Sequence, residues 1–126
     1  MRCLPALVLA VLLGGCADDA REQAAQPGAV GDRVTVVVRP QGEGVPGRER
    51  EVRCPADPEC DRLAKADFDP PSGTVACTQQ YGGPAVATVR GRVGGRAVDA
   101  RFDLTDGCAI ARWERFAWLL GEPPTS

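Results

Sequence analysis

Histidine is absent from the 126-residue chain, and its absence narrows the chemistry open to the protein. Without an imidazole there is no Ser/His or Cys/His pair to activate a nucleophile. No two cysteines are spaced as CxxC, so the usual ligand pattern of a structural zinc site is missing as well. We therefore expect a protein that is not an enzyme and that holds no metal and no cofactor.

A strong charge of either sign is also absent. The only charged residue among the first fifteen is Arg2, and without these fifteen the chain has 14 basic and 17 acidic residues, a net charge of −3. This balance lacks the basic footprint of a nucleic-acid-binding protein and the polybasic patch of a membrane-surface protein. We expect no nucleic-acid partner, and we expect the scattered arginines to lie at the surface.

The N-terminal apolar run, Leu4 to Leu13, is too short to cross a bilayer and has the length of a signal-peptide core. It is followed by Gly14-Gly15-Cys16, which resembles a bacterial lipobox, in which the cysteine sulfur receives a diacylglycerol. We predict a lipoprotein signal peptide over residues 1–15 and lipidation of Cys16, which would anchor an extracytoplasmic protein to a membrane. Ordinary signal cleavage after Ala17 is the alternative and would release a secreted protein.

Aromatic residues are few, with two Trp, one Tyr and three Phe, all from Phe68 onward. Residues 16–32 are polar and alanine-rich, which is typical of a disordered tether. The folded domain is expected over residues 33–121, with a tail at 122–126. A domain of this size has a marginal core, so the few aromatics and covalent crosslinks must supply much of its stability.

Four cysteines remain once the signal peptide and the lipidated residue are set aside: Cys54, Cys60, Cys77 and Cys108. An even number of cysteines in a small exported domain indicates disulfides. Four cysteines allow three pairings, and the spacing favours Cys54 with Cys60 and Cys77 with Cys108.

Strands are predicted in the first half of the domain. The β-branched stretch Arg33 to Arg39 predicts one strand, a glycine-rich loop follows at 41–48, and Arg50 to Arg53 predicts a second. Asp57 precedes a proline and is typical of a helix N-cap, so a short helix is predicted from there through Ala64. A loop closed by the disulfide, without a helix, is the alternative.

The clearest pattern is a hairpin from Ala85 to Leu104 around the turn Gly94-Gly95. This turn places Val89 opposite Ala100 and collects apolar residues on one face of the hairpin. Both carboxylates and all the arginines except Arg96 fall on the other face, which is expected to meet water. A slip of one residue would bury these charges, so the register is well defined.

The last apolar run, Ala109 to Leu120, predicts a helix packed on a sheet. At helical spacing its apolar stripe consists of Ile110, Trp113, Ala117 and Leu120. Trp118 lies off this stripe and would be exposed. The alternative is a helix that stops near Arg115 and a final strand over residues 116–120.

Several motifs occur in one order along the chain: the small Cys54–Cys60 loop, the segment Cys77-Thr78-Gln79-Gln80-Tyr81 before a proline, the pattern Val-x-Gly-x-Val-x-Gly-x-x-Val from Val89 to Val98, Phe102, and Cys108 after a turn. In this order, over about residues 34–120, the chain resembles the Streptomyces subtilisin inhibitor-like family of secreted serine-protease inhibitors. The resemblance implies an α+β fold with an antiparallel sheet of about five strands, two short helices on one face, and two disulfides.

The resemblance also implies a function for the segment after Cys77. In that family the loop is held in an extended, substrate-like form, and the bond two residues past the cysteine lies at the catalytic serine of the protease. Carried onto this chain, Gln79–Gln80 is the reactive bond, and Cys77, Thr78 and Tyr81 complete the reactive loop. The expected function is a membrane-tethered inhibitor of subtilisin-like serine proteases.

The chain departs from that family at Gly82-Gly83, where the family often has a single Asp before the proline, and two glycines predict a more flexible loop. One alternative is that residues 77–84 only connect two elements. The matching function is a non-inhibitory cell-envelope binding or structural lipoprotein that retains the fold, which an exposed Trp118 would fit. The secreted relatives are dimers through a sheet face, and for this chain both a monomer and a homodimer stay open.

Overall fold

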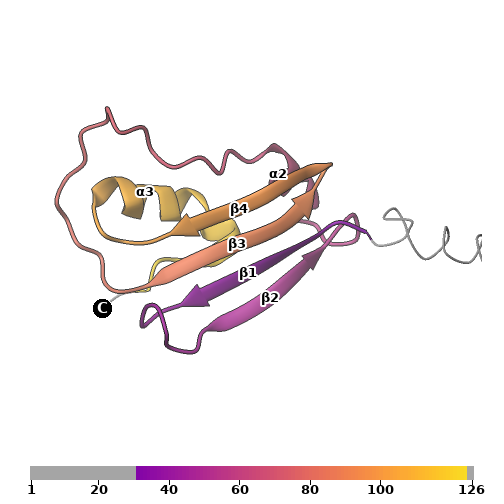
Figure 1. Ribbon diagram of the computed structural model, residues 1–126, viewed down its shortest axis with the longest axis horizontal. Helices are drawn as coiled ribbons and strands as arrows, with labels where there is room; N and C mark the ends of the chain where they lie inside the picture. The colour runs from indigo at the N-terminus through magenta and orange to yellow at the C-terminus, as the bar shows by residue number, and fades with distance from the viewer. Residues whose placement is uncertain (1–30, 125–126) are drawn as a thin grey trace, which may run out of the picture. The chain divides into compact units, whose positions relative to one another are not determined.

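The computed structural model describes residues 31–124, which form an α+β domain (Figure 1). Its sheet consists of β1 (Arg33–Arg39), β2 (Arg48–Arg53), β3 (Val86–Val93) and β4 (Arg96–Phe102). The strands pair antiparallel in the order β2-β1-β3-β4. The first and last pairs are hairpins, and the central pair joins two parts of the chain that are far apart in sequence.

The expectation of about five strands is wrong, because the described residues form a sheet of four. Residues 66–85 contain no strand. Pro70, Pro71 and Pro84 lie in this segment, and proline cannot donate a ladder hydrogen bond. The alternative of a final strand over residues 116–120 is also wrong, because a helix occupies most of that stretch.

The first hairpin follows the predicted alternation. Three side chains of β1 are buried at alternate positions: Val34, Val36 and Val38. β1 has the predicted bounds, whereas β2 begins at Arg48 instead of Arg50. The strand is longer because its ladder with β1 continues until Arg48 lies opposite Val38.

The predicted register of the second hairpin is confirmed, with Val89 opposite Ala100. Gly94 and Gly95 have φ values of 57° and 79°, the left-handed conformation that a tight two-residue hairpin turn requires. The ladder ends where Ala87 lies opposite Phe102, so it is shorter than the predicted hairpin. Six apolar side chains of this face are buried: Ala87, Val89, Val93, Val98, Ala100 and Phe102.

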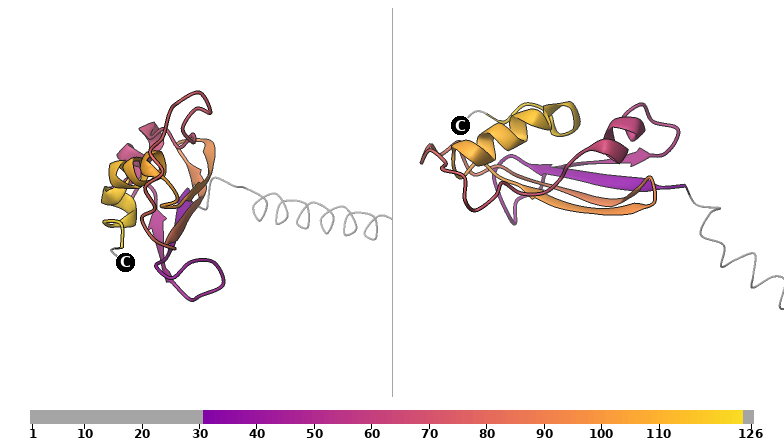
Figure 2. Two further views of the ribbon diagram at one scale, coloured as in Figure 1. Left: turned by 90° about the vertical axis from the view of Figure 1, so that its left-hand side faces the viewer. Right: turned by 90° about the horizontal axis from the view of Figure 1, so that it is seen from above.

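Three short helices lie on the same face of the sheet, one more than predicted (Figure 2). They are α2 (Cys60–Lys65), α3 (Gly107–Arg115) and α4 (Ala117–Leu120). The core forms between these helices and the valines of the sheet, and its largest buried side chains include Trp113, Phe102 and Leu63. The other face of the sheet carries no helix of the described residues.

The predicted N-cap of α2 is wrong, because the helix begins at Cys60 and its cap residue is Glu59. Asp57 instead accepts a hydrogen bond of 2.7 Å from the backbone N–H of Arg53 through Oδ2. Its side chain therefore closes the turn after β2 and does not cap the helix.

The predicted helix over residues 109–120 is interrupted at Phe116, where the backbone leaves the helical region. The ring centroid of Phe116 lies 5.0 Å from those of both Phe68 and Phe102. After the interruption, α4 buries Leu119 and Leu120.

Trp118 is half-buried, contrary to the expected exposure. It packs beside Phe116, and the guanidinium carbon of Arg62 lies 4.4 Å from its ring centroid. The guanidinium group covers the outer face of the indole, which is a favourable cation–π arrangement.

Arg112 is buried, with 6% of its surface exposed, so the expectation that all arginines lie at the surface is wrong. Its guanidinium lies 4.1 Å from the centroid of the Phe102 ring. It donates one hydrogen bond of 2.7 Å to the carbonyl of Arg101 and another to the carbonyl of Phe68. Burial, aided by the nearby Arg115, lowers the pKa of this guanidinium.

The two disulfides join the pairs that the spacing favours, Cys54 with Cys60 and Cys77 with Cys108. The signal peptide, Cys16 and most of the tether predicted over residues 16–32 lie outside the described residues. At the start of the described part, the carbonyl of Asp32 accepts a hydrogen bond of 2.8 Å from the N–H of Cys54. Among residues 31–124, no helix has both the length and the apolar character needed to cross a membrane.

Candidate functional site

The candidate site is the segment from Cys77 to Gly83, which leads into β3. It follows a long irregular stretch that begins after α2 and passes α3 (Figure 1). The disulfide to Cys108 fixes the first residue of the segment to the start of α3, with a Cα–Cα distance of 5.2 Å. The helix is in turn fixed to the core by Trp113, so this attachment is to a well-packed element.

Backbone hydrogen bonds hold the segment on both sides of the predicted reactive bond. The carbonyl of Thr78 accepts a bond of 3.0 Å from the N–H of Gly107. The N–H of Gly82 donates a bond of 2.7 Å to the carbonyl of Leu104. Between these two attachments, three residues are exposed to solvent: Gln79, Gln80 and Tyr81. Tyr81, the one aromatic residue among them, is 65% exposed.

Gly82, the first of the two glycines, is closely packed. A Cβ at this position would lie 3.0 Å from both the Cβ of Leu104 and the Cδ1 of Ile110. A side chain at this position would crowd both neighbours, so either they or the segment would have to shift. Gly83 is buried and has a φ of 113°, a conformation that other residues rarely adopt. These glycines allow a close approach of the backbone to the turn after β4.

Gly107 allows a second close approach, on the other side of the exposed residues. A Cβ on Gly107 would collide with the side chain of Thr78. The preceding residue, Asp106, caps α3 by accepting a hydrogen bond of 2.8 Å from the N–H of Ala109. Such capping fixes the first turn of the helix, and with it the N–H that holds Thr78.

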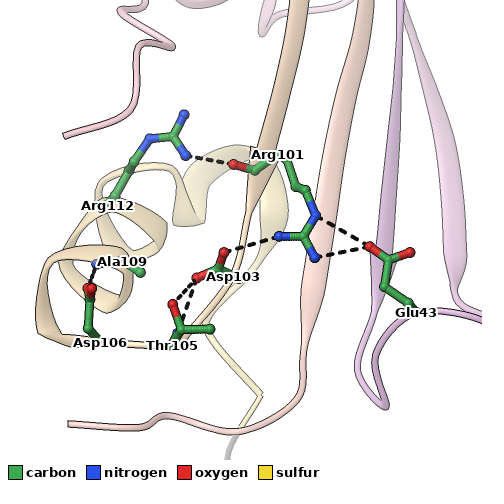
Figure 3. A network of polar contacts seen from close by, with 7 residues as sticks. All are labelled: Glu43, Arg101, Asp103, Thr105, Asp106, Ala109 and Arg112. Carbon is green, nitrogen blue, oxygen red and sulfur yellow. Dashed lines mark hydrogen bonds and ion pairs between the residues drawn. The ribbon is translucent and has the colours of Figure 1, made fainter. Parts of the chain in front are cut away.

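A polar network supports the turn that connects β4 to α3 (Figure 3). Arg101 donates hydrogen bonds to Asp103 at 3.1 Å and to Glu43 at 3.1 and 3.3 Å. Asp103 also accepts hydrogen bonds from the hydroxyl of Thr105 at 2.8 Å and from its N–H at 3.1 Å. From the sequence, Asp103 was expected on a face that meets water, and the network was not predicted. The Asp-x-Thr spacing, which favours a side-chain-closed turn, is the signal that could have found it.

The two cysteines of the site and Asp106 offer a sulfur or oxygen ligand atom each, all within 4.8 Å of one another. The sulfurs of Cys77 and Cys108 are bonded to each other, so neither is the thiolate that a metal requires. The three groups therefore form a crosslink beside a helix cap.

Comparison with known proteins yields no match to a family model, to a curated protein or to a solved structure. The likeness to the subtilisin inhibitors therefore depends on the motifs of the chain itself.

Proposed function

We propose that the protein is a membrane-tethered inhibitor of subtilisin-like serine proteases and that it acts through the exposed residues Gln79, Gln80 and Tyr81. The observation that carries this proposal is the attachment of the segment on both sides of these residues. Thr78 and Gly82 are each hydrogen-bonded to the backbone of the turn after β4, and a disulfide lies next to Thr78. The three residues between them are presented to solvent.

Rigidity is what would distinguish such a segment from an ordinary substrate. A loop already ordered in its bound shape loses little conformational entropy on association, so an interface of standard size can bind tightly. If the bond between Gln79 and Gln80 is cut, the attachments at Thr78 and Gly82 hold the two new ends together. The leaving group then stays in place for the bond to re-form, and the protease remains occupied.

The roles follow from the position of each side chain. Gln79 would enter the specificity pocket of the protease as a long, neutral side chain, with Thr78 before it. Gln80 and Tyr81 would lie on the leaving-group side, where the exposed phenol ring offers a large contact surface. A neutral amide gives no ion pair in an acidic pocket, so the proposal favours proteases of broad specificity over trypsin-like enzymes.

The test uses a soluble form beginning at Ala17, mixed with subtilisin and with trypsin. Inhibition of subtilisin is expected at sub-micromolar concentration, a binding free energy beyond about −8 kcal/mol, with little effect on trypsin. Gln79→Lys should add trypsin inhibition, because it supplies a positive charge at the specificity position. The matched control is Gln80→Lys, which adds the same charge one residue away and should leave trypsin active.

Rapid hydrolysis of the Gln79–Gln80 bond, or no response of either protease to the wild type and to Gln79→Lys, would contradict the proposal. In that case a non-inhibitory envelope binding protein becomes the better account.

The observation that favours this second function is an open groove of about 840 Å³ on the sheet face without helices. Its floor includes Thr35, Val37 and Thr88, and Val45 lines it with 40% of its surface exposed. Trp118 gives this second function no further support, because it is half-buried and not exposed.

A further inference from the structure

The turn from Asp103 to Gly107 holds the candidate reactive segment from both directions. Leu104 accepts the hydrogen bond from Gly82, and Gly107 donates the hydrogen bond to Thr78. The next residue after the turn, Cys108, carries the disulfide to Cys77. The exposed residues 79–81 can keep a fixed shape only if this turn keeps its own.

Asp103 is the side chain that closes the turn. Its Oδ1 accepts hydrogen bonds from both the hydroxyl and the N–H of Thr105, at 2.8 and 3.1 Å. Leu104, whose carbonyl receives the N–H of Gly82, is the residue between the two. The N–H of Thr105 and the carbonyl of Leu104 belong to the same peptide unit, so the carboxylate fixes the unit whose carbonyl the reactive segment uses. The side chain of Asp103 is 29% exposed, so water competes for it less than for a fully exposed carboxylate.

The second oxygen of Asp103 is held from the sheet. Its Oδ2 accepts a hydrogen bond of 3.1 Å from Nη1 of Arg101, and the same guanidinium is bonded to Glu43 in the loop between β1 and β2 (Figure 3). Both oxygens of the carboxylate are thus used, one toward the turn and one toward β4. An amide in place of the carboxylate could satisfy only one of these directions, because its NH₂ group cannot accept from Arg101.

We propose that Asp103 is the positioning residue of the reactive segment, with Arg101 and Thr105 as its partners. Its carboxylate holds the carbonyl of Leu104 and the N–H of Gly107 where they fix Gly82 and Thr78. The effect is local, because exposed ion pairs such as Arg101–Asp103 add little to global stability. This role rests on the proposed inhibition for its biological meaning, but the ordering of the segment can be measured without any protease.

The experiment compares Asp103→Ala with Asp99→Ala in the soluble form beginning at Ala17. Asp99 is a matched control, because it lies on the same sheet face and pairs with Arg90 at 3.2 Å, away from the turn. The first readout is hydrogen exchange of the Gly82 and Gly107 amides in the free protein. Loss of hydrogen bonds to a charged group should make both amides exchange about tenfold faster in Asp103→Ala, with no change in Asp99→Ala.

The second readout is inhibition of subtilisin and hydrolysis of the Gln79–Gln80 bond. Asp103→Ala should weaken inhibition about tenfold and speed hydrolysis about tenfold, since each opening of the turn frees the segment as an ordinary substrate. Asp103→Asn keeps the acceptor for Thr105 and loses the one for Arg101, so it should fall between the wild type and Asp103→Ala. Thr105→Val, which removes only the hydroxyl bond, should also be intermediate.

The outcomes separate this inference from the proposed function. If the wild type inhibits subtilisin, and if Asp103→Ala inhibits equally well with unchanged amide exchange, the positioning role is wrong and the inhibitor function stands. If the wild type inhibits no protease, the inhibitor function is wrong, and the exchange of Gly82 and Gly107 still decides whether Asp103 positions the segment. Equal acceleration in Asp99→Ala would overturn the role as well, because the effect would then come from lost charge alone.

Discussion

At the scale of single residues, Arg112 has a structural role in the core, although a charged residue is expected at the surface. It is buried against Phe102 and donates hydrogen bonds to two carbonyls, of Arg101 in β4 and of Phe68 in the long irregular stretch. This one side chain therefore ties β4, α3 and the stretch that leads to the candidate site. Burial lowers the pKa of its guanidinium, but arginine in a protein remains ionised near neutral pH.

We predict that Arg112→Ala lowers the free energy of unfolding by about 2–4 kcal/mol, because it leaves two carbonyls unpaired and removes the packing over Phe102. Urea denaturation would measure the change. Arg115→Ala is the control, since Arg115 is exposed on the same helix, and it should change stability by less than about 0.5 kcal/mol. Arg112→Met keeps the apolar stem and should recover part of the loss. Equal stability of the two alanine variants would contradict the role of Arg112.

Gly82 gives a second prediction at this scale. Its Cβ in Gly82→Ala would meet Leu104 and Ile110 at 3.0 Å, so these side chains or the segment must shift, and we predict that the domain loses about 1–3 kcal/mol. The control is Gly73→Ala, at a position where nothing lies within 4 Å of an added Cβ. Thermal unfolding of the two variants would measure the difference. If Gly82→Ala is as stable as Gly73→Ala, the segment is not held as closely as the structure indicates.

At the scale of elements, the two disulfides should differ in what they contribute. The Cys77–Cys108 crosslink spans 31 positions of the chain and the Cys54–Cys60 crosslink spans 6. On the chain-entropy model the longer loop is worth about 3–4 kcal/mol and the shorter about 2 kcal/mol. We predict that paired Cys→Ser replacement lowers stability more at Cys77 and Cys108, as denaturant titration of both variants would show. A larger loss of stability on replacing Cys54 and Cys60 would mean that the disulfides act mainly through the native state and not through the entropy of the unfolded chain.

Elements with a simple period could be predicted from the sequence. Alternation fixed β1 and the register of the β3–β4 hairpin, because a slip would bury charged residues. The end of α3 at Arg115 was predicted only in the alternative that continued as a strand, since no glycine or proline marks the interruption. Phe116 packs between Phe68 and Phe102, and both lie far from it in sequence. A fifth strand was expected from the resemblance alone, and the proline-containing stretch of residues 66–85 takes no part in the sheet.

The candidate site was predictable only in part, because some of the contacts that hold it join residues far apart in the sequence. The segment around Gln79 was visible as a motif beside Cys77, and the disulfide to Cys108 followed from spacing. The turn that holds it was not visible, because its interactions join residues from the β1–β2 loop, β4 and the start of α3. Contacts of this kind depend on the three-dimensional arrangement, whereas a sequence pattern reports only on neighbours along the chain.

At the scale of the whole molecule, two parts of the chain have different predicted roles: the domain carries the candidate segment, and Cys16 carries the membrane anchor. The described domain has a face covered by helices and an end where the candidate segment is presented (Figure 2). The predicted lipid at Cys16 would restrict this domain to a membrane surface. An inhibitor held there would act on proteases that reach the same surface, and its local concentration would be higher than that of a freely diffusing protein.

The last prediction tests this anchoring. Cys16→Ala should abolish membrane retention, because the diacylglycerol on Cys16 is the only hydrophobic anchor that the sequence predicts after signal removal, and two acyl chains are enough for stable attachment. Fractionation of cells producing the full chain would measure it, with metabolic labelling by a fatty acid as a direct check on the lipid. Cys3→Ala is the matched control, since Cys3 would be removed with the signal peptide and its replacement should leave the protein in the membrane fraction. A soluble wild-type protein whose first residue is Asp18 would show instead that ordinary cleavage after Ala17 takes place, and the protein would then act as a secreted one.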